Sequence, residues 1–513
     1  MLAEMPRRVT TTSKQWPVTP QNQAWLEESR DDLMVEAAVG PIDSTTKFFI
    51  QEHGPFTHYQ RRISNIDSQI SEDTEWTLDV PWFGWLFRPA AKRFIKQRAP
   101  GSPTRSWWTP STVLSAHDVN LLGLLAAASL LSAFVNTLFT QTVTYAADDF
   151  GIGTTGQGLG AAVVRWGIVL AIPFAIAADR IGRRRVMVLT SFLAPTISAL
   201  GALAPNFQLL VVSQAIGRPL ALTLDVLIMV TAAEEMPKDA RAYALSVLAM
   251  ASGLGAGVAV FALPVAGISI SSWRWIYVIA LLWLVVAQDL RKRLPETKRF
   301  IVAVDNPHRA TIQMSRLALI AGVAFIGNLF VATVSIFQNR YLKDVRDYAP
   351  WQVALFTIAT STPASLGLII GGRIADARGR RLLASTMIPI GTALVVVSFT
   401  VGGSGMWAAA AIGSIAIAIA YPAMSVYRAE LFPTQRRGRA AGLITASALM
   451  GGSIGLIVGG VLLDNNVSYA KVMAILALGP LLVGVIVLTS YPETAHQELE
   501  EINPSDRVRV TKP

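Results

Sequence analysis

The sequence predicts an all-α membrane protein with twelve transmembrane helices in two pseudo-symmetric six-helix bundles, preceded by a small cytoplasmic β-rich extension. Hydrophobic residues make up 52% of the 513-residue chain and charged residues only 15%, against roughly 25% charged residues in an average soluble domain. The apolar residues form long runs without polar alternation. This pattern excludes a β-barrel, whose strands alternate apolar and polar residues.

Twelve apolar runs follow residue 118. Each is close to the ~20 residues that a helix needs to cross ~30 Å of hydrocarbon, and helices buried in soluble proteins are seldom so long or so uniformly apolar. The runs lie at 119–142, 159–178, 186–205, 207–231, 243–267, 274–290, 317–337, 353–371, 383–401, 407–427, 439–463 and 470–490.

A three-part motif that occurs twice sets the number of bundles. Its parts are D-x-x-G-R-R, E-x-x-P-x-x-x-R and P-E-T. The first copy begins at Asp179, Glu234 and Pro295, and the second at Asp376, Glu430 and Pro492. A constant spacing over three unlike motifs indicates a duplicated unit of roughly 200 residues. We therefore divide this part of the chain into an N-terminal bundle at 117–290, a cytoplasmic linker at 291–316, a C-terminal bundle at 317–490 and a cytoplasmic tail at 491–513.

Basic residues collect in alternate loops, at 180–185, 291–299, 373–381 and 436–439. The intervening loops are mostly short and poor in charge, although the segment 340–347 carries both signs. By the positive-inside rule the basic loops and both termini are cytoplasmic, and Asp148-Asp149 is external. We expect a multi-pass protein of the plasma membrane. The net charge of +10 reflects this topology and gives no support for a nucleic-acid partner.

Several kinds of chemistry find no support in the sequence. The chain has no cysteine and five histidines, and none of the histidines has metal-ligand spacing, so we expect no metal and no cofactor. A Walker lysine, a His-Glu-x-x-His motif and a nucleophile elbow are also missing from the sequence. These observations disfavour an enzyme.

The repeated motifs resemble those of the major facilitator superfamily, and the sugar-porter-like branch is closest in motif style. The resemblance covers roughly residues 117–500. It is carried by Asp179-Arg180-Ile181-Gly182-Arg183-Arg184 and its second copy at Asp376, by the segment Tyr427 to Pro433, and by Trp273-Arg274-Trp275. The first copy departs from the pattern where Ala175 replaces the leading glycine. The resemblance implies the major facilitator fold and secondary transport of a metabolite by alternating access.

The resemblance also implies a gate at the cytoplasmic helix ends. A carboxylate at a helix N-terminus is favoured by the macrodipole, and an arginine can hold it through two hydrogen bonds. The alternative is a set of solvated surface charges, each pair worth ~0–1 kcal/mol. The gate residues implied are Asp179, Arg183, Glu234, Arg241, Asp376, Arg380, Glu430 and Arg437.

Three ionisable residues lie deep in the predicted helices: Arg165, Arg218 and Asp225. A rise of ~1.5 Å per residue places them roughly 21, 24 and 13 Å from the cytoplasmic helix ends. Arg218 and Asp225 share a helix face, which Gln214 extends by one turn. A charge at the membrane centre costs about 2.5–3.5 kcal/mol on insertion scales, so we predict a substrate or proton site. In the structural alternative, Arg165 only neutralises Asp225.

The repeat places neutral groups opposite these charges, with Tyr421 as the counterpart of Asp225. Asn136 in helix 1 and Asn328 in helix 7 add polar groups to helices that line the cavity in the superfamily. Polar residues in such helices also act as contacts between helices, and this alternative stays open for both asparagines.

The first 110 residues differ in composition from the rest. We predict a disordered leader at 1–40. At 41–110 we predict a small cytoplasmic domain: a three-stranded meander (46–52, 57–66 and 74–80) followed by a basic, tryptophan-flanked helix on the membrane surface. The alternative to a regulatory role is a passive membrane anchor.

The sequence thus favours a secondary active transporter of a small polar metabolite, proton-coupled and acting on an organic anion. A sugar or polyol porter and a non-transporting receptor of the same fold are the alternatives. The partners expected are the solute, protons and the bilayer, and we expect a monomer.

Overall fold

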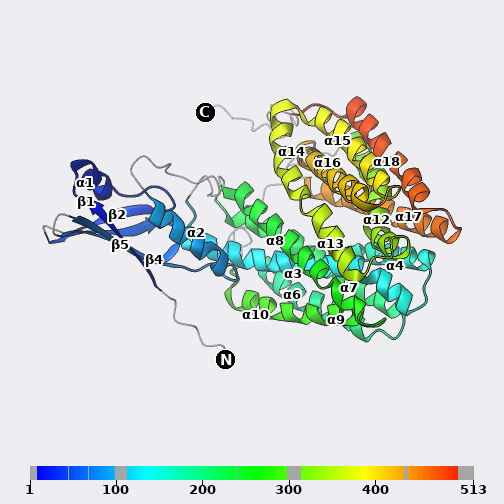
Figure 1. Ribbon diagram of the computed structural model, residues 1–513, viewed down its shortest axis with the longest axis horizontal. Coiled ribbons are helices and arrows are strands. Elements are labelled where there is room, and N and C mark those ends of the chain that lie inside the picture. The colour runs from blue at the N-terminus through cyan, green and yellow to red at the C-terminus, as the bar shows by residue number, and fades with distance from the viewer. Residues whose placement is uncertain are drawn as a thin grey trace.

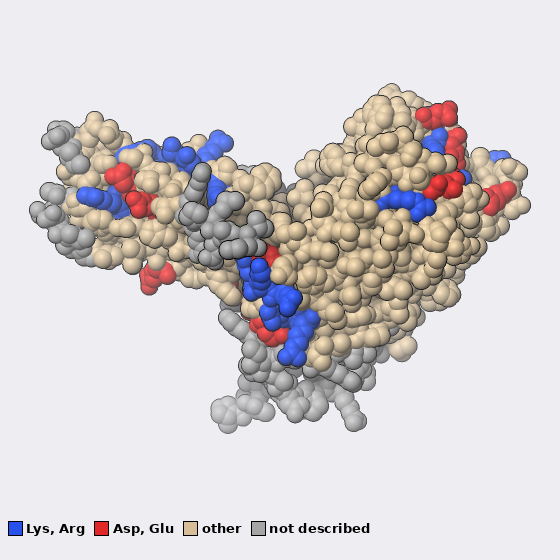
Figure 2. Space-filling view, turned by 90° about the horizontal axis from the view of Figure 1, so that it is seen from below, with Lys and Arg blue, Asp and Glu red and all other residues tan. Residues whose placement is uncertain are grey.

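A computed structural model describes residues 9–43, 46–66, 69–98, 113–237, 240–296, 313–432 and 437–494. The extension lies at one end of the longest axis and the long helices at the other (Figure 1). Figure 2 shows a broad surface without charge over these helices. Charged side chains gather on the extension, at its junction with the helices and at the opposite end of the molecule, as expected for a protein that spans a membrane.

The first bundle begins with the longest helix of the chain. Its α-helices are α3 (Ala116–Asp149), α4 (Thr154–Trp166), α5 (Ala171–Ile181), α6 (Arg183–Ala199), α7 (Phe207–Glu235), α8 (Arg241–Phe261), α9 (Trp273–Ile279) and α10 (Leu284–Arg293). Short 3₁₀ turns extend or join them: η1 (Gly167–Leu170), η2 (Leu200–Leu203), η4 (Leu263–Gly267) and η5 (Ala280–Trp283).

The second bundle repeats this order about 197 residues later, as the duplicated motif predicts. It contains α12 (Met314–Asp344), α13 (Pro350–Ser361), α14 (Ala364–Arg378), α15 (Arg380–Ser398), α16 (Gly403–Glu430), α17 (Arg437–Asp464) and α18 (Tyr469–Ser490). The same backbone turn joins α5 to α6 in the first bundle and α14 to α15 in the second. Gly182 has φ 105° and Gly379 has φ 98°, values that side chains with a Cβ rarely adopt.

Ten of the twelve predicted spans are helices long and apolar enough to cross a membrane within the described residues. The other two, at 159–178 and 353–371, are each divided: α4 and α5 are joined by η1, and α13 is followed by α14. Pro173 lies in the first turn of α5 and Pro363 immediately precedes α14, where a missing backbone N–H costs nothing. The breaks therefore occur at equivalent positions of the two bundles.

The two bundles meet at one end and diverge toward the other (Figure 1). We call the end that carries Asp148 and Asp464 the distal end, and the end that carries Gly182 and Gly379 the motif end. Near the distal end α4 packs directly on α17, because Gly158 faces the backbone of Leu456. A side chain at Gly158 would collide with that carbonyl, so the glycine permits the close approach.

The extension is a five-stranded antiparallel sheet with strand order β1-β5-β4-β3-β2. Its elements are β1 (Thr10–Pro17), α1 (Pro20–Glu27), β2 (Val35–Asp43), β3 (Thr46–His53), β4 (Phe56–Ile66), β5 (Gln69–Leu78) and α2 (Gly84–Gln97). The prediction of a disordered leader is wrong for residues 10–40, which contain β1, α1 and most of β2. β1 pairs with β5 in the register Thr10 to Trp76, and Trp16 and Leu26 are buried beneath the sheet. The predicted meander did not include β1, so the sequence analysis did not indicate that β1 pairs with β5.

A buried ionic cluster fixes β2 against β4. Arg61 Nη2 donates to Glu36 Oε2 at 2.5 Å, and both side chains are buried. Burial raises the pKa of Tyr59, so its hydroxyl stays protonated and donates to Glu36 Oε1 at 2.5 Å. The extension is tied to the helices through Trp82, whose Nε1 donates to Asp289 Oδ2 at 3.1 Å.

Candidate functional site

Arg165 lies in the last turn of α4, immediately before the helix breaks. The negative end of the helix macrodipole favours a cation at this position. Its guanidinium reaches Gly452 on α17 of the opposite bundle. A Cβ added at that glycine would stand 3.1 Å from Arg165 Nη1. Gly452 therefore leaves the space that brings Arg165 to the contact between the bundles.

Arg218 of α7 lies close enough to Arg165 for their guanidinium groups to repel each other. Among the described residues neither arginine forms an ion pair. The pair between Arg165 and Asp225, which the structural alternative requires, is likewise not formed within the described part of the chain. The structure thus brings two cations of the first bundle together without an acidic partner from that part of the chain.

Four polar atoms of the predicted substrate residues are buried without a hydrogen-bond partner among the described residues. They are Asn136 Oδ1, Gln214 Oε1, Arg218 Nε and Asp225 Oδ1. Ser132 of α3 donates to the carbonyl of Ala221 on α7 at 2.8 Å, and Asn136 lies one turn beyond Ser132. Because α3 and α7 run in opposite directions, Asn136 and Arg218 lie at the same height. Native proteins pair the great majority of such atoms, so this cluster is the candidate binding site.

The other predicted substrate residues lie in different surroundings. Gln214 Nε2 donates to the carbonyl of Ser198 at 3.0 Å, a contact between α7 and α6. Asn328 Nδ2 donates to Ala324 of its own helix at 3.0 Å. Tyr421 is 62% exposed. The structure therefore places Arg165 near Arg218, and Asn136 at the height of Arg218. Asp225 lies two helical turns from Arg218 along α7. Gln214 and Asn328 use their side-chain N–H groups in contacts elsewhere.

A polar network at the distal end joins the two bundles, and sequence analysis missed it. Asp148 of α3 pairs with Lys343 of α12 and lies 3.5 Å from Arg340. Arg340 Nη1 donates to Gln157 of α4 at 2.8 Å. Asp464 of α17 accepts hydrogen bonds from the N-terminus of α4. The mixed charges at 340–347, which weakened the topology rule locally, were the pattern that could have revealed it.

Asp149, the neighbour of Asp148, acts within its own bundle. Its Oδ2 accepts a hydrogen bond from Trp273 Nε1 at 3.0 Å and lies 3.5 Å from Arg274 Nη2. Arg274 also donates to the carbonyl of Ala204 at 2.7 Å. The Trp-Arg pair that carried part of the resemblance therefore closes the distal end of the first bundle.

The glutamates of the two Pro-Glu-Thr triplets cap equivalent helices at the motif end. Glu296 Oε1 accepts from the backbone N–H of Arg184 at 3.1 Å, at the start of α6. Glu493 accepts from the N–H groups of Arg380 and Arg381 at 2.9 and 3.1 Å, at the start of α15. Carboxylates at these positions satisfy free donors of the first turn and are favoured by the helix macrodipole.

Most of the predicted gate lies outside the described side chains. This applies to Asp179, Glu234, Arg241, Asp376, Glu430 and Arg437. Of the other two, Arg183 is half-buried and Arg380 Nη1 donates to Thr494 Oγ1 at 2.9 Å. No group of potential metal ligands occurs within the part of the chain that the structure describes.

Comparison with known families decides the classification. The sequence model of the Major Facilitator Superfamily matches residues 125–410 and 317–510. The chain belongs to this superfamily. Its members are transporters, and the duplicated six-helix bundles are the superfamily's fold. No curated protein sequence matches the chain significantly.

Several solved structures share the fold at low sequence identity. The inward-open xylose transporter XylE from E. coli has a TM-score of 0.63 and 15% identity, covering 76% of this chain and 99% of its own. An inward-facing bacterial homologue of the human lysosomal transporter Spinster has a TM-score of 0.57 and 15% identity, over 76% and 98%. A point mutant of the nucleoside transporter NupG has a TM-score of 0.60 and 13% identity, over 73% and 100%.

Proposed function

We propose that this protein is a secondary active transporter that moves a small anionic metabolite by alternating access. The observation that carries the proposal is the pair of mid-membrane guanidinium groups, Arg165 and Arg218, without an acidic partner among the described residues. Each uncompensated charge costs about 2.5–3.5 kcal/mol on insertion scales. An anion bound between them offsets this cost.

The chemistry of the site favours a carboxylate or phosphate group as the ligand. A guanidinium binds either group through two parallel hydrogen bonds. Arg218 carries a buried Nε without a partner among the described residues, so a donor is available there. Asn136, at the same height on α3, supplies an amide for a second polar group of the solute.

Asp225 is the group that we assign to proton coupling. It is the one carboxylate of the candidate site, and it lies two helical turns from Arg218 on the same face of α7. When Asp225 takes up a proton, the site gains positive charge and its attraction for an anion increases. Solute and proton would then enter together, which is symport.

Alternating access requires that the bundles part at one end while they close at the other. The distal network holds that end closed in this structure. We assign the opposing closure to the motif end, with Asp179, Arg183, Glu234 and Arg241 in one bundle and Asp376, Arg380, Glu430 and Arg437 in the other. The molecule acts as a monomer in this scheme, because both bundles belong to one chain.

Uptake into proteoliposomes under an imposed proton gradient tests the proposal. We expect accumulation of small carboxylates or phosphate esters, and Arg218→Gln should weaken apparent affinity by about tenfold or more for the loss of one charge-assisted hydrogen bond. Arg218→Lys should retain part of it. Uptake of neutral sugars with no anion transport would instead support the sugar-porter alternative. Ligand binding without any uptake would support a receptor.

The orientation is tested with single cysteines, because the chain contains none. We propose that the motif end is cytoplasmic and that the protein lies in the plasma membrane. A cysteine at the exposed distal residue Asn465 should react with an impermeant reagent on intact cells. One at the exposed motif-end residue Arg185 should react only after permeabilisation. The reverse labelling would overturn the orientation.

A further inference from the structure

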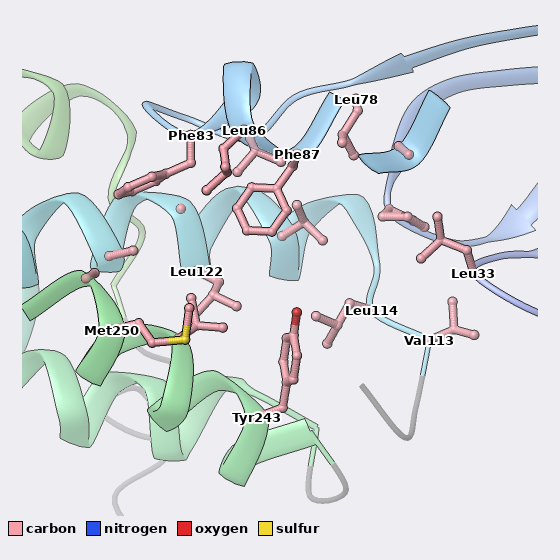
Figure 3. A pocket seen from close by; sticks show the side chains of 18 of the residues that line it. Leu33, Leu78, Phe83, Leu86, Phe87, Val113, Leu114, Leu122, Tyr243 and Met250 are labelled. Carbon is pink, nitrogen blue, oxygen red and sulfur yellow. The ribbon is translucent and has the colours of Figure 1, made fainter. Parts of the chain in front are cut away.

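An apolar pocket lies where the extension meets the membrane-spanning helices (Figure 3). Its volume is about 150 Å³. Leu78, Phe83 and Phe87 line it from the extension, and Leu122 of α3 and Met250 of α8 line it from the opposite side. An apolar cavity of this size stays dry and takes up small apolar molecules. Hydrocarbon, and not water, is therefore its natural content.

The mouth of the pocket opens beside exposed apolar side chains of α8. Met250 is 69% exposed and Leu254 is 56% exposed, and both line the pocket. Both also lie within the candidate membrane span Tyr243–Gly267. Exposed apolar side chains on a spanning helix favour contact with lipid tails over water, so this opening is one that an acyl chain of the bilayer can reach.

Few polar side chains line the pocket. The Tyr243 hydroxyl points into it (Figure 3). Asp32 also lines it, but its carboxylate pairs with Arg30 at 2.8 Å and accepts a hydrogen bond from the backbone of Leu33 at 2.6 Å. The tyrosine hydroxyl thus remains as a donor for an ester or hydroxyl oxygen near the head of an amphiphile.

A basic stripe runs along α2 beside the pocket. Trp85, Arg88, Lys92 and Lys96 are spaced by three or four residues and are all exposed, so they share one face of the helix. Arg88 and Lys92 each follow a pocket residue, Phe87 and Ala91. Tryptophan and basic side chains favour the headgroup level of a membrane, and clustered basic residues attract anionic lipids.

We propose that the pocket binds a segment of an acyl chain of an anionic phospholipid, whose headgroup phosphate contacts Arg88 and Lys92. The chain enters from the bilayer past Met250 and Leu254. The bound lipid then contacts both the extension and α8, and it fastens the extension to the first bundle.

Photo-crosslinking of the full-length protein in lipid nanodiscs tests the proposal. The probes are phosphatidylglycerol and phosphatidylcholine that carry the same diazirine-labelled acyl chain, each supplied at the same mole fraction. We expect crosslinks concentrated in the peptides with residues 83–91 and 243–254. Phosphatidylglycerol should label them more strongly, by about fivefold for each basic side chain engaged.

Variants of α8 and α2 separate pocket binding from general contact with the bilayer. Ala251→Phe fills the pocket. Leu254→Trp, which blocks the mouth of the pocket, is the second variant and is used if Ala251→Phe folds poorly. Both should abolish these crosslinks, whereas Phe261→Trp, at an exposed position of α8 outside the pocket, should keep them. Arg88→Gln with Lys92→Gln should remove the preference for phosphatidylglycerol and retain acyl-chain labelling. Crosslinks spread evenly over all lipid-facing helices, or unchanged in both pocket variants, would overturn the proposal.

Discussion

The carboxylate of Asp464 in the second bundle caps the helix that begins at Thr154 in the first. The backbone N–H groups of Thr154 and Thr155 donate to Asp464 Oδ1 and Oδ2 at 3.0 and 2.9 Å, and the Thr154 hydroxyl also donates to Oδ1. The residue before α4 is Gly153, which has no side chain to provide this cap. Closure of the distal end and capping of α4 are therefore one event.

We predict that Asp464→Ala favours states with the distal end open. Loss of a helix cap costs about 0.5–2 kcal/mol, which shifts the equilibrium by about 2- to 30-fold. Spin labels on cysteines introduced at Ser271 and Lys471, exposed residues of opposite bundles, report the distance between the bundles. A longer-distance population should appear. Asn465→Ala, which removes a hydrogen bond from just beyond α17 to Val461 of that helix, should leave the distance distribution unchanged. An unchanged distribution in Asp464→Ala as well would show that the cap plays no part in closure.

The ion pair between Asp148 and Lys343 should contribute separately to closure. Asp148→Lys and Lys343→Asp should each slow uptake, since each leaves like charges facing each other across the bundles. The double variant should recover part of the loss, with a coupling energy of about 0.2–1 kcal/mol that decreases at high salt. Uptake rates of the four proteins give this energy directly. Strictly additive single effects would show that the two residues do not interact during transport.

Asp225→Asn should separate exchange from accumulation. If Asp225 carries the coupled proton, the amide variant cannot concentrate solute against a gradient, yet it should still exchange labelled for unlabelled solute, because exchange moves no net proton. Both activities are measured in the same proteoliposomes, with purified protein checked for folding by its thermal unfolding. A well-folded variant that still concentrates its solute rules out the proton role.

Glu296→Gln and Glu493→Gln should lower thermal stability. Each removes the negative charge of a cap at the start of α6 or α15, and the expected loss is about 0.3–1 kcal/mol. The unfolding temperature of the purified protein is the measurement. Lys292→Gln, an exposed neighbour, is the control and should change it little. Wild-type unfolding temperatures in both glutamate variants would mean that the charge of these caps does not contribute to stability.

Local pattern was enough to predict much of this molecule. A membrane requires long apolar helices, and the length and composition of each run can be read without knowing its neighbours. The duplicated motif then predicted two equivalent bundles, down to the glycines at 182 and 379. Even so, a run could not show whether its helix was continuous. Pro173 and Pro363 lie at the breaks, whereas Pro219 and Pro480 lie inside continuous helices.

For the candidate site, the sequence identified Arg165, Arg218 and Asp225, since a charge in an apolar helix is conspicuous by itself. It did not determine which of them pair. An ion pair between Arg165 and Asp225 and a repelling pair of arginines are equally compatible with the helix positions, and only the packing of α4 against α7 and α17 distinguishes them.

The sequence by itself determined the membrane class, the duplication and the positions of the buried charges. Each depends on short local patterns, and the duplication on the repetition of such patterns along the chain. The tertiary structure alone decided the distal network, whose partners Thr154 and Asp464 are 310 positions apart, and the sheet of the extension, in which Thr10 lies opposite Trp76. Such contacts form when distant segments bury apolar surface together, and short polar segments such as 10–40 give little indication of them until their partners are in place.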